Sequence, residues 1–354
     1  MTMPATYVYA VIPCERSVSF EVAGLDDDHD EVHAIPNGGF AAVVGASPLA
    51  DYRGLKRDQA VGYLLTHQRV LEAVMHDFPI LPLRFGTVLP DDGWVPRLLA
   101  QGAPLFHTTL DRVAGRVQME LVVLWNLQQV FAEIGQEDHI VQLKRQAAAR
   151  PPQETQVERV AVGQMVQASL QQRRAALQEH IVHALRQIAE DVLLNPAMDD
   201  SMVANVALLL DQAGREALDR LLATLDRESE GRLLFRCVGP LPPYSFATLE
   251  VDLVSFQAVE QARRLLGLAE RVASREIKHA YRQLAAEQHP DRNRQDPQAE
   301  ARMAELTQGY KLLSRYAGHQ APTSDQGAQA MCSFVRQSVE QTLLIALRGQ
   351  EVAS

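Results

Sequence analysis

Residues 275–293 read REIKHAYRQLAAEQHPDRN, and this stretch indicates how the C-terminal part of the chain folds. Ile277, Tyr281 and Leu284 recur at helical spacing, which predicts an amphipathic helix ending before His289-Pro290-Asp291. A second apolar stripe follows, made of Met303, Leu306, Tyr310 and Leu313. Two such stripes predict an antiparallel helical hairpin with the His-Pro-Asp loop at its tip.

The other side of the first helix is basic. Arg275, Lys278 and Arg282 are spaced by three and four residues, which places them on one helical face. Residues 260–316 hold eleven Lys or Arg and eight Asp or Glu, so their balance is 11 − 8 = +3 in a chain of net charge -10. Such a patch favours association with an acidic protein surface and is weakened by salt.

Three segments of this region resemble a J domain: Leu265–Leu268, Arg275–Ala285 and His289–Asn293. The resemblance implies binding to a DnaK-type heat-shock chaperone and stimulation of its ATP hydrolysis. It also implies that His289, Pro290 and Asp291 dock at the chaperone, with Arg275, Lys278 and Arg282 alongside. A second interpretation stays open, in which the hairpin serves only for packing or docking, because Leu266-Gly267-Leu268 lacks the aromatic pair that often starts the first helix of J domains.

The first part of the chain alternates strand and helix signals. Apolar, β-branched runs predict strands at Tyr7–Ile12, at Val117–Trp125, and in a hairpin around Pro36-Asn37-Gly38-Gly39. A helix is expected from about Lys56 to Phe78, with the following residues on its apolar face: Val61, Leu64, Leu65, Leu71, Val74, Met75 and Phe78. Residues 80–88 are strand-like, and a second helix is expected over 94–114.

Residues 127–195 read as helices that Pro151-Pro152 divides. A β–α–β unit follows, with strands at Val203–Leu210 and Arg232–Val238 around a helix, and a short strand at Leu249–Val254. Residues 318–329 read as a linker, and Phe334–Leu347 as a last amphipathic helix.

These signals predict an α+β protein. It contains two small mixed α/β, ferredoxin-like domains joined by helices, and a C-terminal all-α J-like hairpin domain. The expected segments are an N-terminal domain (1–130), connecting helices (131–200), a second domain (201–255), a J-like domain (256–316), and a linker with the last helix (317–354).

Several segments of the first 250 residues resemble a second family, the gas vesicle proteins GvpL and GvpF. The segments are Tyr7–Ala10, Ala42–Val44, His67–Val74 and, most specifically, Ile80–Thr87 (ILPLRFGT). The resemblance implies an accessory protein in gas vesicle assembly, located with the vesicle in the cytoplasm. Its partners would be the small hydrophobic shell protein of the vesicle wall and other accessory proteins. A shell subunit with an exposed apolar face risks aggregation before it enters the vesicle wall. A protein that binds this face and also recruits a chaperone would keep the subunit competent for incorporation.

Composition excludes several classes of protein. A chain with 44 acidic and 34 basic residues is a poor candidate for broad nucleic-acid binding. The longest apolar runs fall far below the roughly 20 residues that span a bilayer, so no membrane association is expected. Three dispersed cysteines, Cys14, Cys237 and Cys332, form neither a zinc motif nor a disulfide framework, which favours a reducing cytosol.

Other candidate chemistry is weak. His67 and His76 are nine residues apart, unlike a helical metal pair, so surface or capping roles are expected. The acidic run Asp26–Glu31, with His29 and His33, lacks calcium-loop spacing and reads as a solvated loop. Arg84 lies in an apolar strand, where it either pairs with a buried carboxylate or faces an edge.

No nucleophile motif, metal site or cofactor site is recognised. The sequence therefore favours a vesicle assembly protein with a J-like chaperone adaptor. A general J-protein co-chaperone with an N-terminal client-binding module is the alternative, and an enzyme on an α+β scaffold is the least favoured reading.

Overall fold

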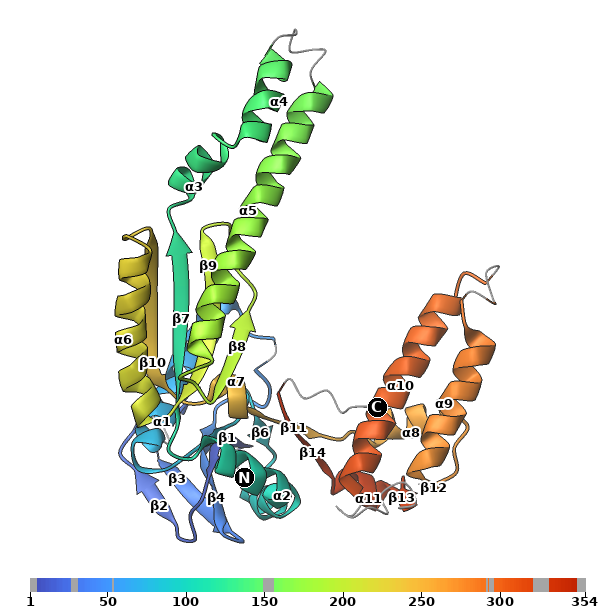
Figure 1. Cartoon of the computed structure of the whole chain (residues 1–354). Helices are drawn as coiled ribbons and strands as arrows, with labels where there is room; N and C mark the ends of the chain where they lie inside the picture. Colours follow the sequence, from blue (N-terminus) through green and yellow to red (C-terminus); the bar gives the residue numbers. More distant parts are fainter. Residues whose placement is uncertain are drawn as a thin grey trace. The chain divides into compact units, whose positions relative to one another are not determined.

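The fold divides into two compact units in this computed structural model (Figure 1), which describes residues 5–26, 31–52, 54–148, 156–290, 292, 296–320 and 331–348. The first unit combines Met1–Arg112 with Ala247–Ser354, and the second comprises Val113–Phe246. Each unit contains its own sheet and apolar core. The mixed α/β class predicted from the sequence is confirmed.

The first unit is built on an antiparallel sheet of six strands. Its order is β2-β3-β4-β1-β5, with β6 also paired to β1. The strands are β1 (Ala5–Ile12), β2 (Val18–Phe20), β3 (Val32–Asn37), β4 (Phe40–Ser47), β5 (Leu81–Pro82) and β6 (Val88–Leu89). The predicted hairpin is β3–β4, and Gly38 and Gly39 at its turn have positive φ angles of 62° and 86°. Such angles are readily adopted by glycine.

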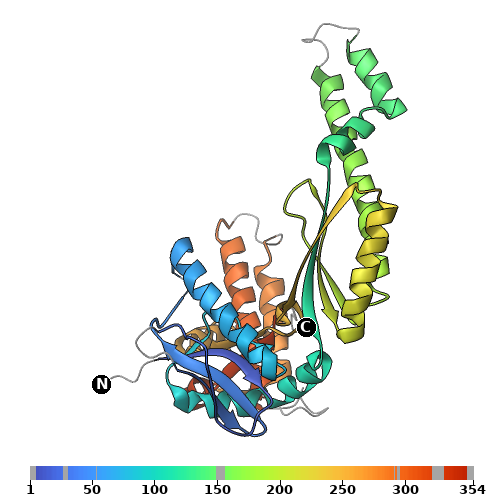
Figure 2. The same ribbon diagram turned by 90° about the vertical axis from the view of Figure 1, so that its left-hand side faces the viewer.

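Two helices complete this part, α1 (Arg57–Asp77) and α2 (Val95–Val113), with a short 3-10 turn, η1 (Asp92–Trp94), before α2. Only the second half of α1 is buried, through His67, Val70, Leu71 and Val74. The apolar face predicted from the sequence is wrong in its first half, where Val61, Leu64 and Leu65 are 47%, 47% and 52% exposed. Figure 2 shows the reason, because the first turns of α1 extend past the sheet.

The second unit has a four-stranded antiparallel sheet of order β10-β7-β9-β8. Its strands are β7 (Val117–Trp125), β8 (Asp191–Asn195), β9 (Met202–Leu210) and β10 (Leu233–Leu241). The helices α5 (Gln156–Leu185) and α6 (Gln212–Glu228) cover one face (Figure 2), and α3 (Leu127–Ile134) and α4 (Asp138–Ala148) pack along the first half of α5. The core joins Leu121, Val123 and Trp125 to Leu185 and Leu218.

Two strand placements differ from the sequence prediction. Val117–Trp125 was expected in the first domain, but it lies between β9 and β10 in the second sheet. The β–α–β unit is therefore split by a strand from earlier in the chain, as in other split βαβ arrangements. Residues 191–195 were expected to be helical, and they form the edge strand β8 on β9 because α5 already ends at Leu185.

A helical module occupies the C-terminal part of the first unit. Its helices are α8 (Phe256–Leu265), α9 (Ser274–Gln288) and α10 (Ala299–Gln320), and the last two form the predicted hairpin. The short elements around them are α7 (Tyr244–Ala247), β11 (Leu249–Leu253), β12 (Arg271–Ala273), β13 (Met331–Ser333), α11 (Arg336–Glu340) and β14 (Leu343–Leu347). The predicted helix over 334–347 is wrong: only five residues are helical, and Leu343–Leu347 pairs with β11. Of the predicted linker, residues 321–329 lie outside the described residues.

Gly86 provides a test of the packing around the ILPLRFGT segment. Its φ is +82°, and an added Cβ would lie 3.0 Å from Cβ of Tyr52. We expect Gly86→Ala to lower the unfolding free energy by about 2 kcal/mol or more, because backbone strain and a close contact add. Gly38→Ala is the matched control, since its φ is +62° with no atom within 4 Å of the added carbon. Urea unfolding of both variants measures the difference, and equal losses would contradict this account.

Candidate functional site

The hairpin of α9 and α10 is held by stacked aromatic rings. Tyr281 and Tyr310 stack with centroids 4.1 Å apart and an interplanar angle of 12°. Ile277 of α9 and Leu306 and Leu313 of α10 are buried in the module's core. At the start of α9, a carboxylate oxygen of Glu276 accepts the N–H of Ala273 at 2.7 Å. The apolar stripes predicted from the sequence therefore form the interior of the α9–α10 hairpin. Figure 1 shows these two helices side by side.

The predicted docking residues are spread along the whole length of α9. Arg275 and Arg282 are exposed, Lys278 is half-buried, and the ion pairs between described residues include none of the three. His289 caps the end of α9 with an exposed side chain, and its carbonyl accepts the N–H of Arg292 at 3.0 Å.

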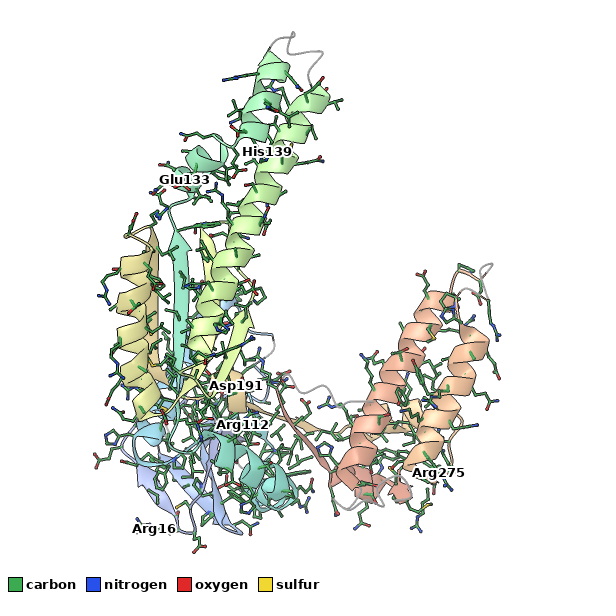
Figure 3. All side chains as sticks on the ribbon, in the orientation of Figure 1. Arg16, Arg112, Glu133, His139, Asp191 and Arg275 are labelled. Atoms are coloured by element: carbon green, nitrogen blue, oxygen red, sulfur yellow. The ribbon has the colours of Figure 1, made fainter. Side chains whose placement is uncertain are left out.

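Pro290 is half-buried beside His289, and Asp291 lies outside the described residues. Arg275 and His289 are 14 residues apart, about 21 Å along the helix, so they mark opposite ends of one surface. Figure 3 labels Arg275 at the end of α9 remote from the loop. The structure thus presents a basic row on one helix and a proline-containing tip at the end of that helix.

The ILPLRFGT segment is anchored on a buried aromatic cluster in the first unit. Phe85 contacts the rings of Tyr7, Tyr52 and His67, with centroids 5.4–6.5 Å apart. The hydroxyl of Tyr7 accepts the N–H of Gly86 at 2.9 Å. The same hydroxyl lies 3.0 Å from Nδ1 of His67, to which it can donate its proton. The segment is therefore fixed to β1 and to α1 at once.

Burial keeps His67 neutral. The side chain is 3% exposed, and desolvation lowers the pKa of His67 from 6.5 to about 4, against a smaller opposing effect from a hydrogen bond to the backbone of Leu83. The surface or capping role expected for His67 is wrong. His76, by contrast, is exposed, with Nδ1 2.8 Å from a carboxylate oxygen of Asp77.

Arg84 leaves this cluster toward acidic residues of β11. Its guanidinium lies 3.2 Å from Asp252 and 3.5 Å from Glu250. Of the two alternatives left open by the sequence, the structure selects an ion pair, although the carboxylates are partly exposed rather than buried. Asp252 also pairs with Arg315 of α10 at 3.2 Å.

Other candidate sites carry little chemistry. No group of three His, Cys, Asp or Glu side chains among the described residues is arranged to hold a metal ion. In the acidic run, residues 27–30 lie outside the described part. A cavity of 430 Å³ in the second unit is lined by Trp125, Val130, Leu177 and several charged groups. Two of these, Arg173 and Glu133, pair with each other at 2.8 Å. None of the described helices combines the length and hydropathy needed to span a bilayer.

Comparison with known proteins accounts for both parts of the chain. The family model described as gas vesicle synthesis protein GvpL/GvpF matches residues 5–248, and a DnaJ domain model matches residues 264–319. Gas vesicle protein F of a Streptomyces species is 28% identical over 245 residues, which cover 68% of this chain and 99% of that protein.

Two further comparisons agree with this division. The crystal structure of GvpF from Anabaena has a TM-score of 0.60 at 23% identity, covering 69% of this chain and 98% of that one. The chaperone protein DnaJ of Salinibacter ruber is 48% identical over 50 residues, only 14% of this chain and 13% of that protein. The fold and the helical module define a two-part protein, an α+β body followed by a J domain. The chain belongs to the GvpL/GvpF family of gas vesicle synthesis proteins and contains a DnaJ domain.

The contacts that the sequence did not reveal join residues far apart in the chain. Tyr7 and His67 are separated by 60 residues, and Arg84 and Asp252 by 168. One signal in the sequence pointed to such a contact: the charged residue Arg84 interrupts an otherwise apolar, strand-like run and therefore needs a partner.

The lowered pKa of His67 predicts an acid-sensitive fold. The unfolded chain binds the proton more tightly than the folded one, so stability is lost as pH falls from about 6.5 toward 4. We expect the unfolding free energy to drop by about 2 kcal/mol between pH 7 and pH 5 from this residue. Urea unfolding of wild type and His67→Gln across this range measures it, and the variant should show a shallower pH dependence.

His76→Gln is the control for this experiment, because it removes an exposed imidazole from the same helix. It is expected to keep the wild-type pH dependence. If His67→Gln also kept the wild-type pH dependence, the role assigned to the buried imidazole would be wrong.

Proposed function

We propose that this protein is a gas vesicle accessory protein that binds the hydrophobic shell protein and supports assembly of the vesicle wall. In this proposal its J domain recruits a DnaK-type chaperone to the bound shell subunit. The protein acts in the cytoplasm and at the gas vesicle, with other accessory proteins as neighbours. Neither nucleic acid nor membrane is a partner, and no catalytic step, metal or cofactor is assigned to it.

The observation that carries the proposal is the presence of both modules in one chain. Residues 5–248 match the GvpL/GvpF model, and residues 264–319 match the DnaJ domain. An assembly factor for a very apolar subunit gains from a nearby chaperone, because exposed apolar surface aggregates unless it is covered.

The J domain supports chaperone docking through its surface. Arg275, Lys278 and Arg282 form a basic row on α9, and His289 and Pro290 lie at its end. A basic row steers association with an acidic surface, and a proline limits the backbone freedom of the tip. We assign docking to these five residues together with Asp291.

The alternative is a general J-protein co-chaperone whose N-terminal part binds unfolded clients of any kind. The observation in its favour is that the described docking residues belong to the J module alone. The two functions differ in client selectivity.

Chaperone docking is tested with His289→Gln in the full-length protein. We expect the variant to bind the DnaK-type chaperone about thirtyfold more weakly, the effect of losing about 2 kcal/mol at a docking hot spot. Stimulation of the chaperone's ATPase should fall in parallel. His76→Gln, an exposed histidine outside the J domain, is the control and should stimulate like wild type. If His289→Gln and wild type stimulate the ATPase equally, the J module does not act on the chaperone through His289. It then serves only as a packing or docking module of the protein.

Client binding is tested by co-purification of the shell protein with the full-length chain. We expect retention by wild type and by His289→Gln alike, because the client contact is assigned to the GvpL/GvpF part. An unrelated unfolded polypeptide is added as competitor. Selective retention of the shell protein supports the assembly function, equal retention of both supports the general co-chaperone, and retention of neither rejects client binding.

A further inference from the structure

The J module begins and ends in the same small sheet. The strand before it, β11, and the strand after it, β14, form an antiparallel ladder from Leu249↔Leu347 to Leu253↔Leu343. Leu249, Val251, Leu343, Leu344, Ile345 and Leu347 are buried in this pair. The module is therefore not attached by a single linker, because its entry and exit strands are bonded to each other.

Both strands are attached to the N-terminal part of the first unit. The N–H of Arg84 donates to the carbonyl of Leu249 at 2.8 Å, and Leu83 forms a parallel bridge with Leu249. At the start of β14, the N–H of Leu343 donates to the side-chain oxygen of Gln101 in α2 at 3.0 Å. The side-chain amide of Gln101 donates to the carbonyl of Gln341 at 3.0 Å.

Helix α10 of the J module is attached to both strands from the other side. One oxygen of Asp252 in β11 pairs with Arg84, and the second pairs with Arg315, each at 3.2 Å. The N–H of Ile345 in β14 donates to Nε2 of His319 at 2.8 Å. Nε2 of His319 also lies 2.7 Å from the carbonyl oxygen of Ile345, and Nδ1 lies 2.8 Å from the carbonyl oxygen of Arg315.

We propose that these contacts form a strap, defined here as β11, β14 and the side chains of Arg84, Gln101, Asp252, Arg315 and His319. The strap holds the J module in one orientation on the N-terminal domain of the same unit. A chaperone docked on α9 therefore meets that domain in a single geometry. Opening the strap frees the module while leaving its helices folded.

The buried ladder and the ion pairs contribute differently to the strap. The side chains of Arg84, Asp252 and Arg315 are 41%, 34% and 38% exposed, so solvent and salt weaken their attraction. The apolar side chains of the β11–β14 ladder exclude water and therefore contribute most of the attachment of the J module. Asp252 helps to orient the J module, because one of its oxygens pairs with Arg84 of the N-terminal domain and the other with Arg315 of α10.

The inference does not depend on the proposed function, since its test measures a distance. Full-length protein carrying Gln59→Cys on α1 and Gln283→Cys on α9 is spin-labelled, and both positions are exposed. Cys237 is exposed and is replaced by Ser, whereas Cys14 and Cys332 are buried. Pulsed electron resonance then gives the distribution of label distances. A narrow distribution in otherwise wild-type protein is expected, and a broad one overturns the proposal.

Ile345→Pro opens the strap, because proline removes the N–H that His319 accepts and disrupts the strand. We expect a distance distribution at least twice as wide, with amide protection of α8–α10 retained. Ile345→Val keeps the N–H and is the matched control with wild-type width. A folded Ile345→Pro protein with an unchanged narrow distribution overturns the proposal.

Asp252→Asn provides a second test if the proline variant does not fold. It retains the ladder but removes the charge shared by Arg84 and Arg315. We expect faster amide exchange in β14 and a label-distance distribution whose width lies between those of wild type and Ile345→Pro. In Asp252→Glu, which keeps the charge, both values should move back toward wild type. Exchange in β14 identical to wild type overturns the role given to this carboxylate.

Discussion

The hydrogen bond between Tyr7 and His67 is the constraint on which the first unit depends. It joins the central strand β1 to α1 inside an aromatic cluster, and the same Tyr7 hydroxyl accepts the N–H of Gly86. A buried hydroxyl or imidazole without a partner is costly, so these groups specify one arrangement of strand, helix and turn. That arrangement directs Arg84 to Asp252 and Glu250, which places the ILPLRFGT segment beside β11.

The sequence predicts well the elements whose signals are local. The J hairpin follows from two apolar stripes and the loop between them, and the structure forms it with Tyr281 on Tyr310. The β3–β4 hairpin follows from its glycine turn. By contrast, Phe334–Leu347 carries apolar residues at helical spacing and also a continuous run, Leu343–Leu347. Periodicity does not separate a helix from a strand in so short a run, and pairing with β11 decides it.

The site shows the same division. The basic row lies on α9 and His289 caps its end, so sequence spacing alone predicts that these residues share one element. The remaining contacts join distant segments: Asp252 lies in β11, and its partners Arg84 and Arg315 lie just after β5 and in α10. A lone arginine in an apolar run indicates that a partner is needed, but it does not say where that partner is. The structure likewise shows that His67 is buried in the core, whereas His76, on the same helix, is exposed. Sequence spacing does not distinguish the two histidines.

The ladder between β11 and β14 raises a question of folding entropy, because 343 − 253 − 1 = 89 residues separate its nearest ends. Closing a flexible loop of that length costs entropy that grows with the logarithm of length, before any strand contact forms. The J module removes most of this cost if it folds first, because its helical core and the β12–β13 pair bring its two ends together. Its two ends then already meet, with the guanidinium of Arg336 in α11 4.6 Å from the ring of Phe256 in α8. A module that folds first and has adjacent ends can therefore be inserted in the sequence between two paired strands with little added entropy cost for their pairing.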